Sequence, residues 1–476
     1  MGVKNQEIYS SKKGWISFLK KNKRNKKIKR RKAGYNLYKR NIKKHAIGSD
    51  RNYKSYSRSS NWRGVKTPKK PVYSEKIKYL LSIPELFSKE KLSTNDNGNL
   101  MIPKCFSLIE NSKESFDFLK KLLLALHTNK FKKITLDYST CERIDVDASI
   151  CMDIILAEFI IYFKSCVRLG FGNEISIKSI EPINFEDKEN IKKVLFSIGA
   201  YRNITGFKVD YPDIIGLPVI VNDHKADNVW SKSELDLTNI VEYIKECLGR
   251  LNRELTIDAE NEFYKVIGEI MSNALEHSST DFSYAIGFFQ ETLNDDEHFG
   301  IFNFSIFNLG DTIYQTFKNE NCLNKTAVSE MNALSENFTN NGLFKRASFE
   351  EETLWTLYAL QEGITCKPKK RGNGSIQYIE NFFKLKGDMT KDNISFMTIV
   401  SGNTRIIFDG TYQVIKKTKE DSNRKYKFIT FNESGDINDK PNKKYVNFAP
   451  NFFPGTLISA RILIKFDNTN KNTDEN

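Results

Sequence analysis

Two polar side chains whose spacing could support chemistry, Glu269 and Asn273, lie in the amphipathic run DAENEFYKVIGEIMSNALEHS that begins at Asp258. A spacing of four residues places both on one face of a helix, one turn apart. A carboxylate and an amide oxygen placed in this way can orient a water molecule and ligate Mg²⁺ beside a triphosphate. Taken alone, the pair fits a solvated helix face better, so its interpretation depends on the segments that follow.

Three glycine-bearing segments follow this run along the chain. They read FNFSIFNLGDTI at 302–313, RGNGSI at 371–376 and PGT at 454–456. The first alternates like a strand and ends at Gly310, the second opens a helix, and the third leads into a strand expected at 457–466. Glycines let the backbone approach a ligand closely, and a glycine turn before a helix presents free N–H groups to phosphate. Together, in this order, the segments predict a nucleotide site.

These motifs resemble those of the GHKL ATPase superfamily, which holds histidine kinases, gyrase-type topoisomerases, MutL and the anti-sigma kinases. EIMSNALEHS is similar to the N-box of that superfamily, FNLGDTI to its first glycine box and RGNGSI to its second, over about residues 220–467. The resemblance implies a Bergerat-type α/β sandwich that binds ATP and Mg²⁺. It implies that Glu269 is the general base or water-positioning acid and that Asn273 is the Mg²⁺ ligand.

The resemblance also implies a wider set of cofactor-binding residues. His277 would lie near the phosphates, the glycine turn would cradle them, and Thr456 would lie beside the adenine. Lys367, Lys369, Lys370 and Arg371 adjoin the glycine turn, with a solvated loop as the alternative. The full set is Asn273, His277, Asn308, Gly310, Lys370, Arg371, Gly372, Asn373, Gly374 and Thr456.

Asn308 departs from the pattern of the superfamily. The first glycine box normally begins with an aspartate that accepts a hydrogen bond from the adenine amino group, and Asn308 occupies that position. An amide oxygen can accept the same bond but without its charge-assisted strength. Asp311, after the glycine, is a poorer substitute. We therefore expect weaker nucleotide binding and a less strict preference for adenine.

The middle of the chain must supply the elements beside this site, and it alternates between helix and strand patterns. We expect helices at 75–89, 113–126 and 188–203, strands at 107–109, 134–138 and 175–180, and a long apolar helix capped by Asp147 that runs through Phe163. The stretch LDYSTCERID at 136–145 resembles the STAS domain of anti-sigma-factor antagonists. Val146 occupies the position of the phosphate-accepting residue of that family, and the role does not transfer to nearby Ser149. A structural or dimerising α/β module is therefore the preferred interpretation.

The predicted organisation has four parts. Their bounds are 1–72 for a basic extension, 73–215 for the STAS-like domain with a linker helix, 216–467 for the GHKL-like domain, and 468–476 for a polar tail. Within the third part we expect a lid at about 311–371 and an inserted hairpin or loop at about 416–447.

The net charge of +15 is divided unevenly along the 476 residues. Residues 1–70 hold 24 Lys and Arg but two acids, a net charge of +22, and the remaining residues have a net charge of −7. Aromatic residues are interleaved with these cations, which suits phosphates and stacked bases of RNA or DNA. The alternatives are a solubilising tail or a segment that docks on the acidic body. The basic extension is thus predicted to bind nucleic acid.

Composition excludes several classes of protein. A hydrophobic fraction of 39% excludes global disorder. The most apolar stretch, 144–163, contains four acids, which argues against a membrane span. Seven widely spaced cysteines without a Cys-x-x-Cys pair argue against a disulfide framework or a zinc site and favour a reducing, cytoplasmic location.

Three functions are consistent with these features. The preferred one is a regulatory ATPase, a switch in which ATP and Mg²⁺ change subunit pairing in a homodimer and regulate what the basic extension binds. The second is an anti-sigma-type protein-serine kinase with a protein partner at the STAS-like domain. The third is a non-enzymatic nucleic-acid-binding scaffold with a vestigial pocket, which Asn308 favours. Transcriptional regulation, stress signalling and bacterial anti-phage defence would all fit.

Overall fold

The computed structural model describes the chain from residue 71 to residue 471 with internal gaps. The described residues are 71–87, 98–128, 133–169, 179–198, 209, 211–276, 280, 282–294, 297–339, 350–366, 374–386, 394–418, 425–463 and 469–471. The basic extension predicted at 1–70 lies outside them. Within them the chain is a mixed α/β protein with parallel and antiparallel sheets.

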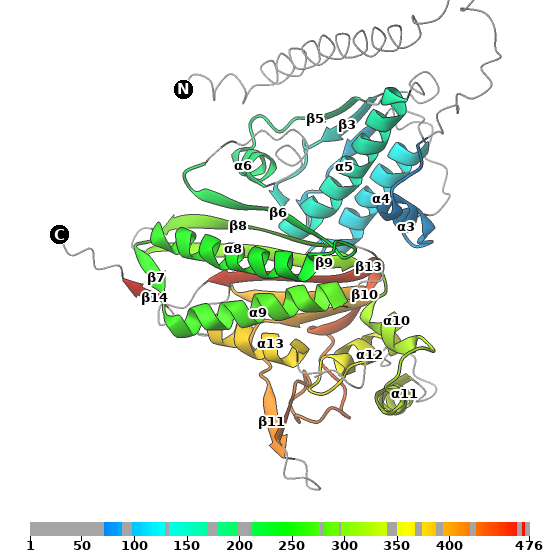
Figure 1. Cartoon of the computed structure of the whole chain (residues 1–476), viewed down its shortest axis with the longest axis vertical. Helices are drawn as coiled ribbons and strands as arrows, with labels where there is room; N and C mark the ends of the chain where they lie inside the picture. The colour runs from blue at the N-terminus through cyan, green and yellow to red at the C-terminus, as the bar shows by residue number, and fades with distance from the viewer. Residues whose placement is uncertain are drawn as a thin grey trace, which may run out of the picture.

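A five-stranded antiparallel sheet forms the centre of the molecule (Figure 1). Its strand order is β10-β13-β9-β8-β6. The bounds are β6 Ile214–Asp223, β8 Phe282–Asn294, β9 Glu297–Leu309, β10 Phe396–Phe408 and β13 Val446–Leu463. The strand predicted to end at Gly310 is therefore confirmed as β9, and it lies at the middle of the sheet.

Three helices cover one face of this sheet (Figure 1). They are α8 Val229–Gly249, α9 Ile257–Glu276 and α13 Gly374–Leu385. The predicted amphipathic run is α9, and its apolar residues recur at helical spacing and are buried; they are Phe263, Val266, Ile267, Ile270, Met271 and Ala274. The polar side of α9, with Glu269 and Asn273, is thereby turned away from the sheet.

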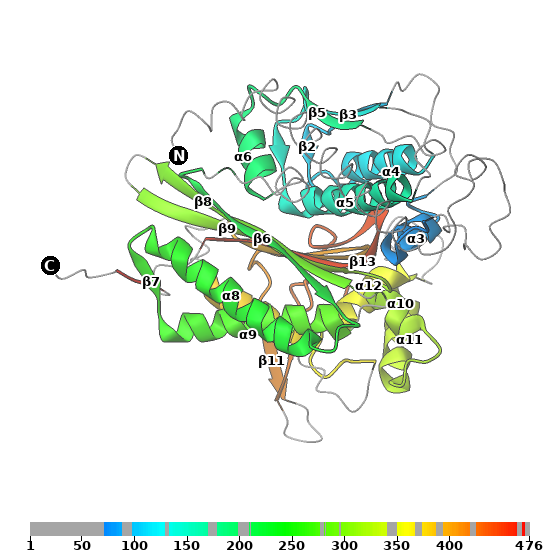
Figure 2. The ribbon, with the colours of Figure 1, turned by 45° about the horizontal axis from the view of Figure 1, so that its top comes forward.

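The N-terminal unit covers the opposite face of the sheet with its helices (Figure 2). Its elements are α3 Glu75–Ser82, β1 Asn99–Met101, β2 Cys105–Phe106, α4 Ser112–Thr128, β3 Lys133–Asp137, β4 Arg143–Ile144, α5 Val146–Arg168, β5 Ser179–Ile183 and α6 Glu189–Ser197. Strands β1, β3 and β5 pair in parallel, as do β2 and β4. The alternating α/β pattern predicted for this region is confirmed.

Strand β8 shows how both faces of the central sheet are buried. Tyr284, Ile286 and Phe288 pack into the core shared with α4 and α5. Ala285 and Phe289 pack on the other face, with α8, α9 and α13. Successive side chains of a strand point to opposite faces, so this strand directs apolar side chains to both faces of the sheet. Both faces must therefore be covered by other elements. The two predicted domains therefore share one hydrophobic core along this sheet.

Several predicted element bounds in the N-terminal unit were wrong. The strand expected at 107–109 is a turn after β2, because the Ser107 hydroxyl accepts hydrogen bonds from the backbone N–H groups of Ile109 and Glu110. The helix expected at 75–89 ends at Ser82, and Pro84 cannot continue it. The cap of α5 is Asp145 rather than Asp147.

The C-terminal part differs from prediction in two places. The strand expected to begin at Leu457 begins at Val446, so the PGT segment lies within β13. The tail contains a short strand, β14 Thr469–Lys471, which pairs with β7 Arg253–Leu255. The insertion, expected to form a hairpin or a loop, contains a hairpin of β11 Ile415–Thr418 and β12 Lys425–Phe428.

The predicted lid region contains three helices that adjoin the end of the sheet. They are α10 Ile313–Lys318, α11 Lys325–Thr339 and α12 Glu351–Ala359. Helix α12 contacts both β10 and β13, and α10 contacts β10.

No helix among the described residues is long and apolar enough to cross a membrane. All seven cysteines are free thiols.

Asp147 is a buried carboxylate beside the contact between the two units. It is 2% exposed, and its Oδ1 accepts hydrogen bonds from the backbone N–H groups of Leu108 (3.2 Å) and Ala148 (2.6 Å). Burial, together with the negative charge of Asp145, raises the pKa of Asp147 to about 7. The folded protein therefore holds a proton at pH values where the unfolded chain has lost it.

This proton makes stability depend on pH. A raised folded pKa means that stability is present at low pH and is lost between about pH 4 and pH 7. Asp147→Asn keeps an oxygen acceptor without the charge. The free energy of unfolding of the variant, relative to that of wild type, should therefore increase by about 2–3 kcal/mol from pH 5 to pH 8. Urea unfolding at both pH values measures this gain. The exposed Asp117→Asn on α4 is the control, and an equal gain there would contradict the interpretation.

Candidate functional site

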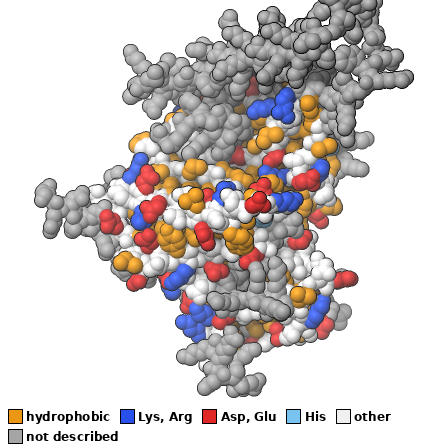
Figure 3. Space-filling model, viewed as in Figure 1, with side chains coloured by type: hydrophobic (Ala, Val, Ile, Leu, Met, Phe, Trp, Pro, Cys, Tyr) orange, Lys and Arg blue, Asp and Glu red, His pale blue; other side chains and the backbone are white. Residues whose placement is uncertain are grey.

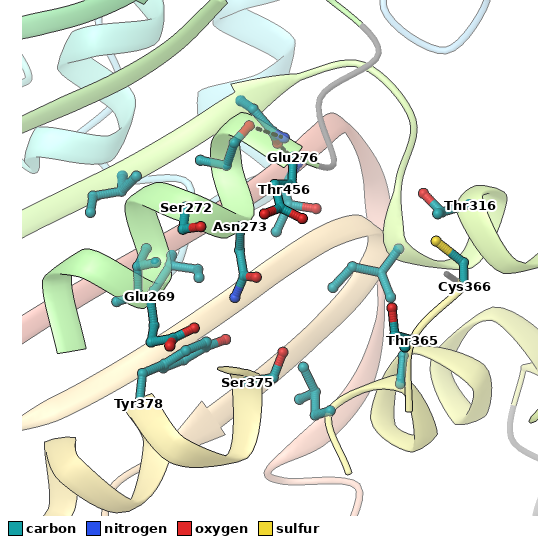
Figure 4. A pocket seen from close by; sticks show the side chains of 18 of the residues that line it. Glu269, Ser272, Asn273, Glu276, Thr316, Thr365, Cys366, Ser375, Tyr378 and Thr456 are labelled. Carbon is teal, nitrogen blue, oxygen red and sulfur yellow. Dashed lines mark hydrogen bonds between the residues drawn. The ribbon is translucent and has the colours of Figure 1, made fainter. Parts of the chain in front are cut away.

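A cavity of about 520 Å³ lies between α9, the end of β9, the middle of β13, and helices α10, α12 and α13 (Figure 4). Its size is typical of a site for a small-molecule ligand. The apolar part of its lining includes Ile270, Ile306, Ile313, Leu360 and Ile458. Polar side chains from several elements converge on the same space, which is the usual composition of a ligand site.

Glu269 and Asn273 point from α9 into this cavity, on the side that faces α13 (Figure 4). Both side chains are partly exposed, and neither has a hydrogen-bond or ion-pair partner among the described residues. Burial, and to a lesser extent the nearby carboxylate of Glu276, raises the pKa of Glu269 above that of an ordinary glutamate. The structure therefore brings together an oxygen ligand and a carboxylate with increased proton affinity.

Asn308 lies at the end of β9, on the cavity wall, and is 3% exposed. Its Nδ2 donates to the carbonyl of Ala274 at 3.2 Å, and its Oδ1 accepts from the backbone N–H of Thr456 at 3.1 Å. Because one partner only accepts and the other only donates, the amide has one orientation. Asn308 thus ties α9, β9 and β13 together, a role that the sequence did not predict.

Thr456 extends this connection to the next strand. Its hydroxyl lies 2.9 Å from the hydroxyl of Ser401 on β10. Ser401 also accepts from the backbone N–H of Ile313 at 2.9 Å. Ile313 is the first residue of α10, and Thr312 caps that helix in a capping box with Gln315. The wall formed by α10 is thereby fixed to the strands that carry Asn308 and Thr456.

The glycines of the predicted motifs have distinct positions. Gly310 has φ +138° and does not line the cavity; its carbonyl accepts a 2.7 Å hydrogen bond from the Tyr79 hydroxyl of α3. Asp311, the next residue, does line it. Gly374 is the first residue of α13, which places the N-terminus of that helix beside the cavity at Ser375 (Figure 4). A helix N-terminus at this point favours negative charge in the cavity.

Five of the predicted site residues lie outside the described residues, as do Lys367 and Lys369. The five are His277, Lys370, Arg371, Gly372 and Asn373. Their predicted roles stay predictions. The residues that are brought together are Glu269, Asn273, Asn308 and Thr456, with Gly374 at the start of α13.

Several lining residues were missed at the level of sequence. They are Ser272, Glu276, Thr316, Thr365, Cys366, Ser375, Gln377 and Tyr378. Ser375 and Tyr378 are three apart directly after the glycine segment, so helical spacing could have identified them. Thr316 had no such signal, because only the packing of α10 against β10 places it here.

Ser149 cannot serve as an accessible phosphate acceptor in this conformation. It is fully buried within α5. The preceding segment carries a charged cluster in which Arg143 pairs with Glu110 at 2.6 Å and with Asp145 at 2.7 Å. The burial of Ser149 is thus consistent with the absence of an acceptor role at this position.

No family model, curated protein or solved structure matches the chain in comparisons with known proteins.

Gly455 permits the close approach of β13 to Asn308. Its φ is +141°, and a Cβ at this position would lie 2.1 Å from the Asn308 backbone oxygen. Gly455→Ala should therefore lower the free energy of unfolding by about 1–3 kcal/mol. Chemical denaturation measures this loss. Gly249→Ala, at the end of α8 with no atom within 4 Å of the added Cβ, is the control and should be neutral or slightly stabilising. Equal losses in both variants would contradict the role of Gly455.

Proposed function

We propose that the chain is an ATP- and Mg²⁺-dependent regulatory ATPase of the GHKL type, with its nucleotide site in the cavity beside α9. The observation that carries this proposal is the convergence of Glu269 and Asn273 on the space that also receives the N-terminus of α13. Each group alone has other interpretations. Few other interpretations remain when a base, an oxygen ligand and an anion-favouring helix end face one cavity. Phosphoryl transfer uses all three groups.

The apolar end of the cavity suits a nucleobase. Ile306 and Ile458 from the sheet and Ile313 from α10 can pack against the faces of a planar ring. Asn308 and Thr456 supply polar atoms at this end. Both ends of the Asn308 amide already have protein partners, so only one lone pair and one N–H remain for a base. This limited capacity supports the expectation of weaker adenine recognition than a free aspartate would give.

The other end of the cavity suits the phosphates. Ser375 at the start of α13 lies opposite Asn273, as Figure 4 shows. Bound Mg²⁺ would neutralise phosphate charge and polarise the phosphorus–oxygen bond. Asn273 would hold the ion through its amide oxygen. Mg²⁺ usually keeps several waters and takes one or two protein ligands besides the phosphates, so a single amide fits this mode of binding.

Glu269 would act on the attacking water. Its carboxylate has no hydrogen-bond partner among the described residues, so it can accept a proton from a water that Asn273 helps to position. The raised pKa brings its proton affinity closer to neutral pH, where a general base is most effective. Tyr378 lies beside Glu269 in Figure 4 and closes that side of the cavity.

Regulation would act through the elements that surround the cavity. Helices α10 and α12 line it from the predicted lid region. Tyr79 of α3, directly after the basic extension, contacts Gly310. Lys76 of the same helix forms a 2.7 Å ion pair with Glu158 of α5 and lies over the ring of Phe282 at 4.0 Å. Helix α3 thus contacts both the N-terminal unit and the edge of the site.

Two substitutions test the assignment. Asn273→Ala should weaken Mg²⁺-dependent ATP binding at least about tenfold, because the ion loses its protein ligand. Glu269→Gln should keep binding but lower kcat about 10²- to 10⁴-fold. In wild type, the rate of hydrolysis should rise with pH around a pKa above the ordinary glutamate value. This rise should be absent in Glu269→Gln. Calorimetry and phosphate release measure these effects.

Asn261→Ala, on the exposed side of α9, is the matched control and should leave both activities unchanged. Unaltered ATP affinity in Asn273→Ala would refute the site. Transfer of labelled phosphate to a partner protein, with no free phosphate, would support the kinase alternative instead.

The basic extension is proposed to bind nucleic acid, on the strength of its net charge of +22 and its interleaved aromatic residues. Deletion of residues 1–70 should remove most of the salt-sensitive affinity for RNA or DNA, as measured by fluorescence anisotropy from 50 to 200 mM salt. Nucleotide binding by the remaining chain is the control. Retention of full nucleic-acid affinity after the deletion would contradict this proposal.

A further inference from the structure

The hairpin of β11 and β12 projects from the end of the molecule opposite α5 (Figure 1). Its strands pair in the register Ile415↔Phe428, Lys416↔Lys427, Lys417↔Tyr426 and Thr418↔Lys425. Directly paired residues share a face of an antiparallel ribbon, and the faces alternate along it. One face therefore carries Lys416, Thr418 and Lys427, and the other carries Ile415, Lys417, Tyr426 and Phe428.

The first face places two cations beside one carboxylate. Lys416 and Lys427 are directly opposite each other, an arrangement that destabilises a hairpin by itself. A single carboxylate, Glu380 of α13, contacts both lysines, at 3.5 Å for Lys416. Lys384 adds a third cation, and together these charges lower the pKa of Glu380 although burial acts to raise it. Lys416 keeps 59% of its side chain exposed.

The second face combines a cation with aromatic rings. Tyr426 stacks on Phe428 with ring centroids 5.5 Å apart. Lys417 lies over the Phe428 ring at 4.9 Å, and its Nζ donates to the carbonyl of Gly435 at 3.0 Å. Lys417 is exposed and Tyr426 is partly exposed. This face therefore presents a positioned ammonium group beside an accessible ring.

The surrounding insertion is positively charged within an acidic body. Residues 416–447 hold nine Lys and Arg against five acids, whereas residues 71–476 as a whole have a net charge of −7. Lys440, Lys443 and Lys444 are exposed in the same insertion. Figure 3 shows Lys and Arg side chains gathered beside the hairpin. Charge concentrated in this way on a projecting ribbon is complementary to a polyanion.

We propose that the β11–β12 hairpin is a second nucleic-acid-binding element. Lys417 and Tyr426, which share one face, contact a backbone phosphate and the adjoining nucleotide, and the exposed Lys416 on the opposite face contacts a neighbouring phosphate. A two-stranded ribbon has the width that the major groove of a DNA duplex accepts. A membrane surface is a poorer occupant, because the apolar Phe428 is buried and the exposed described positions are Lys416, Lys417 and Thr418.

The hairpin is held firmly against the rest of the protein. The backbone N–H of Lys427 donates to the Glu362 carboxylate, and the backbone N–H of Glu362 donates to the carbonyl of Lys427 at 3.2 Å. Lys427 Nζ also lies 3.3 Å from Oε1 of Gln377 on α13. Lys427 is thus part of the attachment, so a test should leave it in place and replace the exposed Lys416 and Lys417.

The full-length variant Lys416→Glu/Lys417→Glu tests the proposal. Its affinity for a fluorescein-labelled 30-nucleotide RNA and for a 30-base-pair DNA should fall about tenfold at 100 mM salt for at least one of the two. The slope of log affinity against log salt should decrease by about 2, one for each lost phosphate contact. Lys104→Glu/Lys133→Glu is the matched control, since both lysines are exposed, lie in the N-terminal unit and give the same change of charge. It should change affinity less than twofold.

Photo-cross-linking separates the hairpin from the basic extension. The nucleic acid that the wild-type full chain binds more tightly, carrying 4-thiouridine if RNA or 5-iododeoxyuridine if DNA, should on irradiation yield cross-linked peptides that include residues 415–418 or 425–428. Absence of such peptides, or equal losses of affinity in the hairpin and control variants, would overturn the proposal. So would binding to phosphatidylserine vesicles without binding to either nucleic acid.

Discussion

The central antiparallel sheet is buried on both faces, and the geometry of the cavity depends on that burial. Strands β8 and β9 carry large apolar side chains at both parities. Exposure of either face would cost about 25 cal/mol for each Å² of apolar surface, so both helical layers are required. The layer of α8, α9 and α13 fixes the helix that carries Glu269 and Asn273. The layer of α3, α4 and α5 fixes the N-terminal unit against the same strands.

Hydrogen bonds at one end of the sheet convert this packing into a defined cavity wall. Asn308, Thr456 and Ser401 connect three neighbouring strands, and their further bonds reach α9 and α10. Asn308 and Ser401 are buried, where an unpaired amide or hydroxyl would be costly. The network therefore favours one arrangement of the wall. The positive φ of Gly455 is part of that arrangement, because a side chain there would displace Asn308.

Basic and acidic side chains are also enriched in different parts of the molecule. Residues 71–476 have a net charge of −7, yet the insertion at 416–447, far along the chain from the basic extension, holds nine Lys and Arg against five acids. At the cavity, in contrast, the described lining residues include three carboxylates, Glu269, Glu276 and Asp311, and no Lys, Arg or His. Binding of a triphosphate there would thus require Mg²⁺ and the helix terminus of α13, together with the cations predicted at 367–371, to offset like-charge repulsion.

The sequence by itself determined the local features of this protein. The spacing of apolar residues identified α9 and its polar pair, alternation identified β9, and the glycine before Ser375 marked the start of α13. The division of charge between residues 1–70 and the body also needed no structure. All of these depend on residues close together in the chain, so periodicity and composition suffice.

Only the tertiary structure decided which distant residues meet. The amide of Asn308 is engaged by Ala274 and Thr456, and Asp147 is buried against the turn at Leu108 rather than capping α5. The predicted start of β13 failed because Gly455 reads locally as a turn, whereas pairing with β9 and β10 carries the strand through it. These outcomes depend on contacts between segments tens to hundreds of residues apart, for which a single sequence has no local signal.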